Sequence, residues 1–540
     1  MSQSRPLGAQ ISHMLKDRGV DVIFGIPGVH NQEMYRGIEE AGITHVLARH
    51  EQGAGFMADG YARATGKPGV AYVITGPGLT NIMTPMGQAY SDSVPMLVIS
   101  SCLDDTSITG QLHQMKDQRG AAGTVCHWSK EARTAAGAYT LIDQAFGEFM
   151  AQRKRPKHIQ VPISLLEGPA EPAPPSPEYA AGIEDSPVNR PLLAQRITEA
   201  QRPLFIFGGG AAHARLNPDS SDIMLDQPGW VDAFIKLGAA SFTTYAGRGI
   251  IPGDAPLHFG ATLARPDSAH VIASADLVVA VGTSLDEVDL WRQHLGHSAQ
   301  MIRIDIDPSV LSDHHHASMQ VHADASFAMD NICKRCAGNM QSSGWSEEDV
   351  RTFRARARAE VDAERPGIVL VCDALRDCLP KGTMIYSDMT QFAYTAKEVW
   401  DMDYPGHWHH PTGFGTLGYA TPAAIGGAVG RQGKPTLAII GDYGFHYTMA
   451  ELGVAVELGL PLPIILWDNG KLKEIEDSMV RAQIAPNAVV ARNPDFVQLA
   501  RAFGANAAAP GSLDEMQKTV RAAFDADGPT LIYLTPEIAG

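Results

Sequence analysis

Two short apolar segments on either side of a helical segment constrain the fold of this chain more than any other feature. The apolar segments are residues 437–440 and 462–467, and between them the apolar residues of 449–458 recur at helical spacing. This order is typical of two buried parallel strands joined by a crossover helix. The chain is therefore predicted to have an α/β fold built from doubly wound parallel sheets.

Oxygen-bearing side chains follow both apolar segments. Gly-Asp-Tyr-Gly at 441–444 follows the first, where the glycines predict a tight turn, and Asp468 and Asn469 follow the second. The carboxyl ends of parallel strands meet at one edge of a sheet, where open α/β sheets bind ligands. Mg²⁺ prefers such oxygen ligands and shares its remaining positions with phosphate oxygens. The pattern indicates a metal site that anchors a diphosphate, and two glycine turns without a metal are the alternative.

Length and charge narrow the class of protein. At 540 residues, about three domains are expected. The net charge of −17, with acidic and basic residues interspersed, argues against a nucleic-acid partner and against an anionic membrane. The sequence predicts neither a signal peptide nor a membrane-spanning segment, so a cytoplasmic protein is expected.

Three α/β regions are expected along the chain, at 1–168, 190–336 and 367–540. A Pro-rich linker is predicted between the first two regions and a polar connector at 337–366 between the last two. The predicted strands include 21–24, 203–207, 277–281, 301–306 and 383–387.

Several blocks of sequence resemble one enzyme family. RHEQGAGFMADGYARATGKPGV at 49–70, GPGLTN at 76–81 and QAYSDSVP at 88–95 resemble the pyrimidine-binding domain of thiamine-diphosphate enzymes of the acetolactate synthase and 2-oxo acid decarboxylase type. The Gly-Asp pair at 441–442, followed by Asn469, resembles the cofactor signature of the same family. The resemblance covers almost the whole chain and implies three domains: pyrimidine-binding, central and diphosphate-binding.

The resemblance implies roles for individual residues. Glu51 would be the catalytic glutamate that hydrogen-bonds the pyrimidine of thiamine diphosphate, and Asp442, Asn469 and the main-chain carbonyl of Lys471 would hold Mg²⁺. Gly415 would offer backbone groups to the same ring, while the side chain of Leu417 would force the cofactor into its bent conformation. The further predicted cofactor-binding residues are Pro27, Gly28, Gly76, Asn81, Gln88, Asp388, Thr390, Gly441, Tyr443 and again Asp442. The family usually has Gly at the position of Tyr443.

The predicted substrate is a small 2-oxo acid. Two further blocks, PGVHNQEMYRGI at 27–38 and LHQMKDQ at 112–118, together with the blocks above look most like the 5-guanidino-2-oxopentanoate decarboxylase group. The acids on a predicted helix at 472–479 would suit the guanidinium of that substrate. The substrate candidates are His30, His113, Gln114, Glu474 and Asp477, with polar loop residues and a solvated helix face as the alternatives. An acetolactate-synthase-like carboligase acting on pyruvate is the second hypothesis, and a non-catalytic thiamine-diphosphate-binding regulatory protein is the third.

The sequence also bears on the assembly of the protein, on FAD and on other metal sites. The resemblance implies a homodimer or homotetramer with active sites between subunits. FAD in the central domain is not favoured, because the triple glycine at 208–210 lacks the full dinucleotide-binding spacing. The histidines at 314–316 and at 407, 409 and 410 are predicted to be solvated loop residues rather than metal ligands. Cys333 and Cys336 have no second cysteine pair to complete a zinc site.

Overall fold

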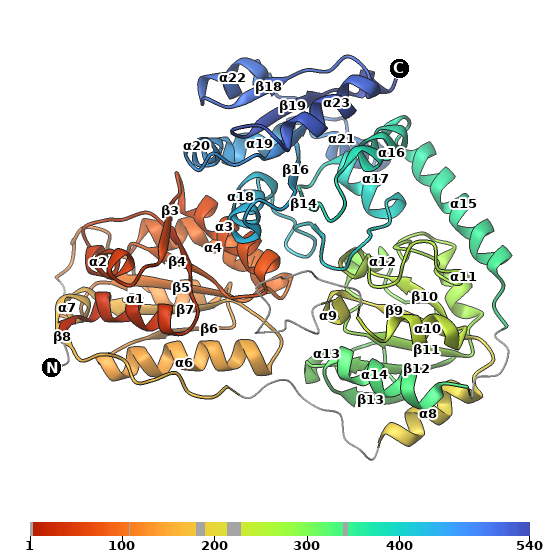
Figure 1. The fold of residues 1–540 in the computed structure, drawn as a ribbon, viewed down its shortest axis with the longest axis horizontal. Coiled ribbons are helices and arrows are strands. Elements are labelled where there is room, and N and C mark those ends of the chain that lie inside the picture. The colour runs from red at the N-terminus through yellow and green to blue at the C-terminus, as the bar shows by residue number, and fades with distance from the viewer. Residues whose placement is uncertain (1–3, 107, 180–188, 213–227, 339–343) are drawn as a thin grey trace.

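The protein is described by a computed structural model, which covers residues 4–106, 108–179, 189–212, 228–338 and 344–540. Three parallel sheets follow one another along the chain, with helices packed around them (Figure 1). A small antiparallel pairing of β1 (Arg5–Pro6) with β8 (Pro169–Ala170) lies beside the first sheet. The predicted fold class, α/β with doubly wound parallel sheets, is confirmed. Part of the predicted Pro-rich linker, residues 180–188, lies outside the described residues.

The N-terminal sheet has the strand order β3-β2-β4-β5-β7-β6. Both of its faces are buried, because Val70 and Tyr72 pack into one core while Ala71 and Val73 pack into another. Its strands are β2 (Val22–Gly25), β3 (Thr44–Leu47), β4 (Gly69–Val73), β5 (Met96–Cys102), β6 (Trp128–Glu131) and β7 (Lys157–Pro162). Its longer helices are α1 (Leu7–Asp17), α2 (Gln32–Glu40), α3 (Glu51–Thr65), α4 (Pro77–Ser91) and α6 (Ala135–Ala151).

The other two sheets are parallel as well. The central sheet, in the order β10-β9-β11-β12-β13, consists of β9 (Pro203–Phe207), β10 (Ala240–Thr243), β11 (Leu277–Val281), β12 (Gln300–Asp305) and β13 (Met319–His322). The C-terminal sheet, in the order β15-β14-β16-β17-β19-β18, consists of β14 (Met384–Ser387), β15 (Trp408–His409), β16 (Thr436–Gly441), β17 (Pro463–Trp467), β18 (Asn506–Ala508) and β19 (Thr530–Leu534). The longer helices around these sheets are α8 (Asn189–Glu199), α14 (Ala325–Cys336), α16 (Ile368–Cys378), α17 (Gln391–Val399), α18 (Ala420–Arg431), α21 (Lys473–Arg481) and α23 (Leu513–Ala523).

Helices α3 and α18 join the N-terminal and C-terminal sheets into one body (Figure 1). They approach so closely that a Cβ at Gly60 would lie 1.9 Å from the carbonyl oxygen of Ala423, and one at Gly426 would lie 1.9 Å from that of Met57. The hydroxyl of Tyr419 also donates to Asp59 at 2.7 Å. Small residues at this crossing let the two backbones touch, which holds the first and last regions in a fixed relation.

The polar connector predicted at 337–366 is largely an ordered helix, α15 (Glu347–Glu364). The side chain of Ser346 accepts the backbone N–H of Asp349 at 3.1 Å, and three acids occupy the first turn, so the helix start is capped and favourably charged. Its apolar face buries Val350, Phe353, Ala357 and Val361. The sequence predicted a polar connector here but not this helix, because the many exposed charges obscured a narrow apolar stripe.

Two observations bear on the environment of the protein. None of the helices in the described parts of the chain is long and apolar enough to cross a membrane. All six cysteines are free and buried.

Candidate active site

The segment after β16 contains the first predicted metal ligand. Strand β16 runs directly into α19 (Asp442–Thr448), so the predicted tight turn at 441–444 is wrong. Gly441 has a φ of −81°, which any residue adopts. Gly444 is needed for space, because a Cβ there would lie 2.9 Å from the carboxylate of Asp388. Asp442 thus becomes the first residue of a helix, with Tyr443 partly buried beside it.

Asp442 faces a second carboxylate, that of Asp468 at the end of the neighbouring strand β17. The amide of Asn493 lies between them and donates to Asp442 at 2.8 Å and to Asp468 at 3.0 Å. Burial raises the pKa of Asp442 to about 6, the Asn493 hydrogen bond opposes this rise, and the Asp468 charge adds to it. Two close carboxylates that repel each other match the oxygen ligands a divalent cation prefers. Sequence reasoning missed Asn493, which lies in a loop without a motif.

The other predicted metal ligands lie in the loop after β17. The side-chain oxygen of Asn469 accepts the backbone N–H of Lys471 at 3.3 Å, and its amide lies 3.4 Å from Gln391. The ammonium of Lys471 pairs with Glu476 at 3.0 Å, which directs the lysine side chain toward helix α21. Since β16 and β17 are adjacent parallel strands, the three predicted ligands stand just after the carboxyl ends of these strands, at one sheet edge.

Asp388 is a completely buried carboxyl group beside the predicted pyrimidine contacts. It accepts the backbone N–H of Gly418 at 2.7 Å, immediately before α18. Burial raises its pKa to about 7, and backbone hydrogen bonds oppose that rise. The carboxyl group therefore fixes the position of Gly418, the residue directly after Leu417. Gly415 has a φ of +69°, which favours glycine, and Leu417 is half-buried, while buried Thr390 packs against the end of β16.

Glu51 is the first residue of α3 and lies at the carboxyl end of the N-terminal sheet. The amide of Asn81 donates to its carboxylate at 2.9 Å. A Cβ at Gly78 would lie at an ordinary contact distance of 3.4 Å from this carboxylate, and the close contact there would be with Ile74 at 2.8 Å. The structure thus brings two predicted residues together and orients the carboxylate with a hydrogen bond.

Two predicted substrate residues also meet in this region. The rings of His30 and His113 lie edge to face, with their centroids 5.1 Å apart. His30 lies in the turn that Gly28 begins after Pro27 and β2, and its pKa is lowered by burial and then by the neighbouring His113. Gly76 has a φ of +73°, and a Cβ there would lie 2.5 Å from the carbonyl oxygen of His113. The two histidines, the Gly28 turn and the Gly76 turn therefore form one cluster.

Gln118 holds the Gly76 turn in place, a role that sequence reasoning missed. Its side-chain oxygen accepts the hydroxyl of Thr75 and the N–H of Gly76, both at 2.9 Å, while its amide donates to the carbonyl of Ser101 at 2.8 Å. Gln114, by contrast, accepts the N–H of Gly110 at 2.7 Å and braces its own exposed loop. The sequence LHQMKDQ alone did not indicate which of its two glutamines, Gln114 or Gln118, holds the Gly76 turn.

The predicted substrate acids on α21 are already paired with cations of this chain. Glu474 accepts from Arg365 at 2.8 Å and from Gln391 at 3.0 Å. Asp477 pairs with Lys473 one turn earlier in the helix. Glu474 is connected through Gln391 to the Asn469 loop, whereas Asp477 pairs only along its own helix face in the contacts described. Of the two, Glu474 is better placed to face a substrate.

A cavity of about 240 Å³ lies where the three regions meet. Gln88, fully buried, donates to Asp92 at 2.7 Å and accepts the hydroxyl of Thr416 at 3.2 Å, so it braces the cavity wall rather than an open cofactor surface. Residues lining the cavity include Arg153, Gly209, Gly210, Asp289 and His410. The triple-glycine segment at 208–210 therefore borders a cavity through Gly209 and Gly210. From sequence this segment was only a weak indication of a nucleotide site.

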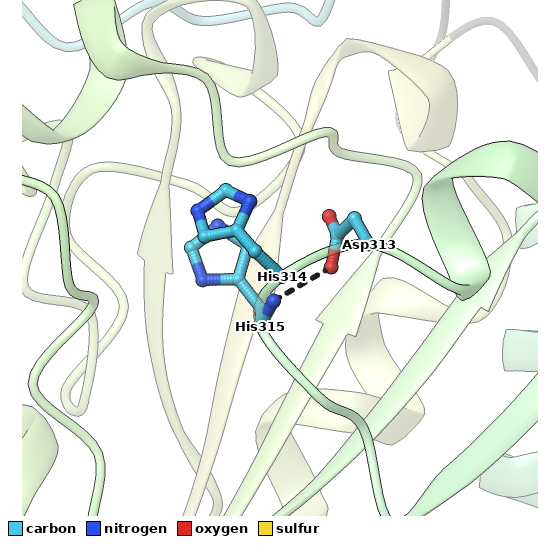
Figure 2. Close-up of side chains that lie close together, drawn as sticks. All are labelled: Asp313, His314 and His315. Atoms are coloured by element: carbon cyan, nitrogen blue, oxygen red, sulfur yellow. Dashed lines mark hydrogen bonds between the residues drawn. The ribbon is translucent and has the colours of Figure 1, made fainter.

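Asp313, His314 and His315 form a cluster of metal-ligating residue types in the central region (Figure 2). One oxygen of Asp313 accepts the backbone N–H of His315 at 3.0 Å, as Figure 2 shows, and the other pairs with buried Arg303 at 2.5 Å. The two imidazole rings have their centroids 4.1 Å apart and are tilted by 36° relative to each other. Because both carboxylate oxygens are engaged and a guanidinium is adjacent, the cluster is a structural turn rather than a cation site.

The prediction of solvated histidines was wrong for His315, which is 5% exposed, and for the whole second cluster. His407, His409 and His410 are at most 6% exposed. They lie on and beside β15, the edge strand of the C-terminal sheet, where the guanidinium of Arg248 from the central region lies 4.6 Å from the ring centroid of Trp408. Ser387 contacts the ring of His410 at 2.9 Å. Burial of this edge by another domain could not be read from local polarity.

The geometry defines an α/β protein with an acidic, metal-type site on the C-terminal sheet and an oriented glutamate on the N-terminal sheet. The chain matches the N-terminal TPP binding domain of thiamine pyrophosphate enzymes over residues 5–121, their central domain over 192–332 and their C-terminal TPP binding domain over 388–534. It belongs to the thiamine pyrophosphate enzyme family and carries the domains that bind thiamine diphosphate.

Named relatives cover nearly the whole chain. It is 41% identical to the "Probable 2-ketoarginine decarboxylase AruI" of Pseudomonas aeruginosa, over 98% of this chain and 93% of that protein. It is 27% identical to the acetolactate synthase isozyme 2 large subunit of Escherichia coli, over 98% of this chain and 95% of that protein. Identity to the acetolactate synthase large subunit of Haemophilus influenzae is 28%, over 94% of this chain and 90% of that protein.

Proposed function

We propose that this chain catalyses the non-oxidative decarboxylation of 5-guanidino-2-oxopentanoate with thiamine diphosphate and Mg²⁺. The observation that carries the proposal is 41% identity, over 98% of the chain, to a relative whose name gives 2-ketoarginine, the same compound, as substrate. In the reaction the bond between the carboxylate and the keto carbon breaks. CO₂ leaves, the keto carbon gains a proton, and 4-guanidinobutanal is the product.

Asp442, Asn469 and the main-chain carbonyl of Lys471 are proposed to hold the Mg²⁺. Support comes from the opposed carboxylates of Asp442 and Asp468, whose mutual repulsion a divalent cation would relieve. Asp468 accepts from the hydroxyl of Tyr533 at 3.0 Å and from Asn493, so its role is to orient the site.

When bound, thiamine diphosphate supplies the carbon nucleophile and the electron sink for decarboxylation. Glu51 would share a proton with the pyrimidine ring, and Asn81 keeps its carboxylate oriented. Gly415 and Leu417 would hold the same ring from the C-terminal region. The histidine pair of His30 and His113 is proposed to deliver the proton that the keto carbon gains, because an imidazole can exchange a proton near neutral pH.

The proposed assembly is a homodimer or homotetramer in which the N-terminal half-site of one subunit faces the C-terminal half-site of another. Exposed apolar side chains support it, since they border both halves: Val29, Ile108 and Leu112 on one, and Ile475, Val480 and Val490 on the other. We further propose domain limits of 1–168, 190–336 and 367–540 and a cytoplasmic location, with which six free, buried cysteines agree.

A carboligase of the acetolactate synthase type is the second candidate. The 27% identity to the E. coli enzyme over nearly the whole chain favours it, as does the central cavity, whose position would suit a flavin nucleotide. FAD remains the less favoured cofactor, because the triple-glycine turn is the single dinucleotide feature among the described cavity-lining residues. A regulatory protein without activity is disfavoured, since Glu51 is oriented by Asn81 and Asp442 lies in a cluster of oxygen ligands.

The test is to incubate purified protein with thiamine diphosphate and Mg²⁺ and to compare the guanidino acid with pyruvate. Preferred release of CO₂ from the guanidino acid, with the aldehyde as product, supports the proposal. Preference for pyruvate with accumulation of acetolactate supports the carboligase instead. Absence of CO₂ release from either acid contradicts both enzymes.

A further inference from the structure

Glu451 is a buried carboxyl group that reaches from the C-terminal region to the start of α3. It is 1% exposed. One carboxyl oxygen accepts the backbone N–H of His50 at 2.9 Å, and the N–H of Arg49 lies 3.1 and 3.2 Å from the two oxygens. These residues directly precede Glu51, the first residue of the helix. A carboxyl group more than 400 positions away in sequence therefore caps the helix that presents Glu51.

The packing around this carboxyl group is close. A Cβ at Gly53 would lie 2.1 Å from Glu451, so the second residue after Glu51 must lack a side chain for the contact to exist. Glycine inside a helix lowers helix stability by about 1 kcal/mol relative to alanine. At Gly53 the close contact with Glu451 explains why glycine is present despite this loss. The guanidinium of Arg49 in turn pairs with Glu457 of α20 (Leu452–Glu457) at 2.5 Å, which adds a second link between the same two segments.

Charged groups face Glu451 from both segments. Arg49, the N-terminal end of α3 and the two backbone N–H groups favour its ionised form, while Glu51 opposes it. The ring of His50 accepts the N–H of Gln52 and is directed along the helix. Burial is the largest effect and raises the pKa of Glu451 to about 7. Glu451 thus changes charge near neutral pH at a short distance from Glu51.

We propose that Glu451 is a positioning residue for Glu51, which fixes the first turn of α3 and, by changing its own charge, makes proton sharing by Glu51 depend on pH. The inference rests on the proposed thiamine chemistry, in which Glu51 shares a proton with the cofactor. A purely structural cap would hold the helix in the same way but would leave the pH dependence of proton sharing unaffected.

Two substitutions separate these roles. Glu451→Gln keeps an acceptor for the backbone N–H groups but removes the charge, whereas Glu451→Ala removes both. Glu457→Gln, which removes the exposed partner of Arg49, is the matched control. The measurement is the rate of deuterium exchange at C2 of bound thiamine diphosphate across pH 5–9, with cofactor affinity measured in parallel. Exchange reports on Glu51 without any substrate.

Glu451→Gln is expected to abolish the change in exchange rate that wild type shows near pH 7, because the side chain at position 451 then no longer gains a negative charge there. Glu451→Ala is expected to slow exchange at least about tenfold with cofactor affinity within about threefold of wild type. Glu457→Gln should match wild type. The same pH profile in Glu451→Gln and in wild type overturns the proposal, and this variant decides if Glu451→Ala does not fold.

The same variants and measurements distinguish a failure of this proposal from a failure of the proposed function. If wild-type protein binds thiamine diphosphate but shows no C2 exchange, the proposed function fails. In that case Glu451 still has a measurable effect on the apoprotein. Its raised pKa makes the folded state lose stability as pH rises from about 4.5 to about 7. Thermal unfolding of the apoprotein should show this loss in wild type and not in Glu451→Gln.

Discussion

Arg365 donates to Glu474, with its Nε 2.8 Å from the carboxylate oxygen. This carboxylate, predicted from sequence to recognise a guanidinium, therefore already binds one that belongs to the chain itself. The proposed substrate carries the same planar cation, so it must share Glu474 with Arg365 or displace it. Gln391 touches both Glu474 and Asn469, which places the ion pair one side chain away from the proposed metal loop.

Glu474→Gln is expected to raise KM for 5-guanidino-2-oxopentanoate about tenfold or more, because a charge-assisted hydrogen bond contributes about 1.5–3 kcal/mol. 2-Oxohexanoate, whose tail carries no charge, should be affected about twofold or less. Steady-state kinetics with both acids on the same preparation make the comparison. Equal losses on the two substrates would mean that Glu474 has a structural role and does not recognise the tail.

Mg²⁺ binding is expected to weaken as pH falls. The pKa of Asp442 is raised to about 6, and a protonated carboxyl group cannot ligate the metal, so protons compete below this value. Apparent affinity should decline about tenfold per pH unit well below 6 and level off above it. Asn493→Ala, which removes the hydrogen bond that lowers this pKa, should move the midpoint to higher pH. Calorimetric titration of Mg²⁺ in the presence of thiamine diphosphate tests both, and a pH-independent affinity would count against Asp442 as a ligand.

Glu51→Gln should bind thiamine diphosphate with nearly wild-type affinity but turn over about 10²–10⁴-fold more slowly, since general acid–base catalysis contributes that much. The amide keeps the shape of the side chain and can still contact Asn81. Cofactor titration and single-turnover CO₂ release give the two quantities separately. Near-native turnover would exclude the proposed role of Glu51.

Local features of this chain could be predicted from sequence. Strands β9 and β11 match the predicted segments 203–207 and 277–281 residue for residue, because strands buried on both faces form continuous apolar runs. Motifs at strand and helix ends placed both Glu51 and Asn81 among the predicted site residues, and the structure joins them by a hydrogen bond.

Long-range contacts could not be predicted in this way. Glu451 lies about 400 positions from the backbone it caps, and Asn493 lies in a loop without a pattern. The burial of His410 depends on another region covering β15. Helix α15 was missed because its apolar stripe is narrow among many charges. In each case the deciding interaction comes from a distant segment of the chain, which local periodicity does not report.

Gly60→Ala is expected to destabilise the protein, because its Cβ would meet the carbonyl oxygen of Ala423 at 1.9 Å and force α3 away from α18. Overpacking of this kind costs about 1–3 kcal/mol, more than the gain of up to about 1 kcal/mol in helix propensity. Gly147→Ala inside α6 is the matched control, since its nearest neighbour is Tyr179 at an ordinary 3.4 Å, and this change should be neutral or stabilising. Thermal unfolding should therefore shift to lower temperature for Gly60→Ala and not for Gly147→Ala. Equal shifts in the two variants would mean that the α3–α18 crossing tolerates a side chain and does not hold the two sheets in a fixed relation.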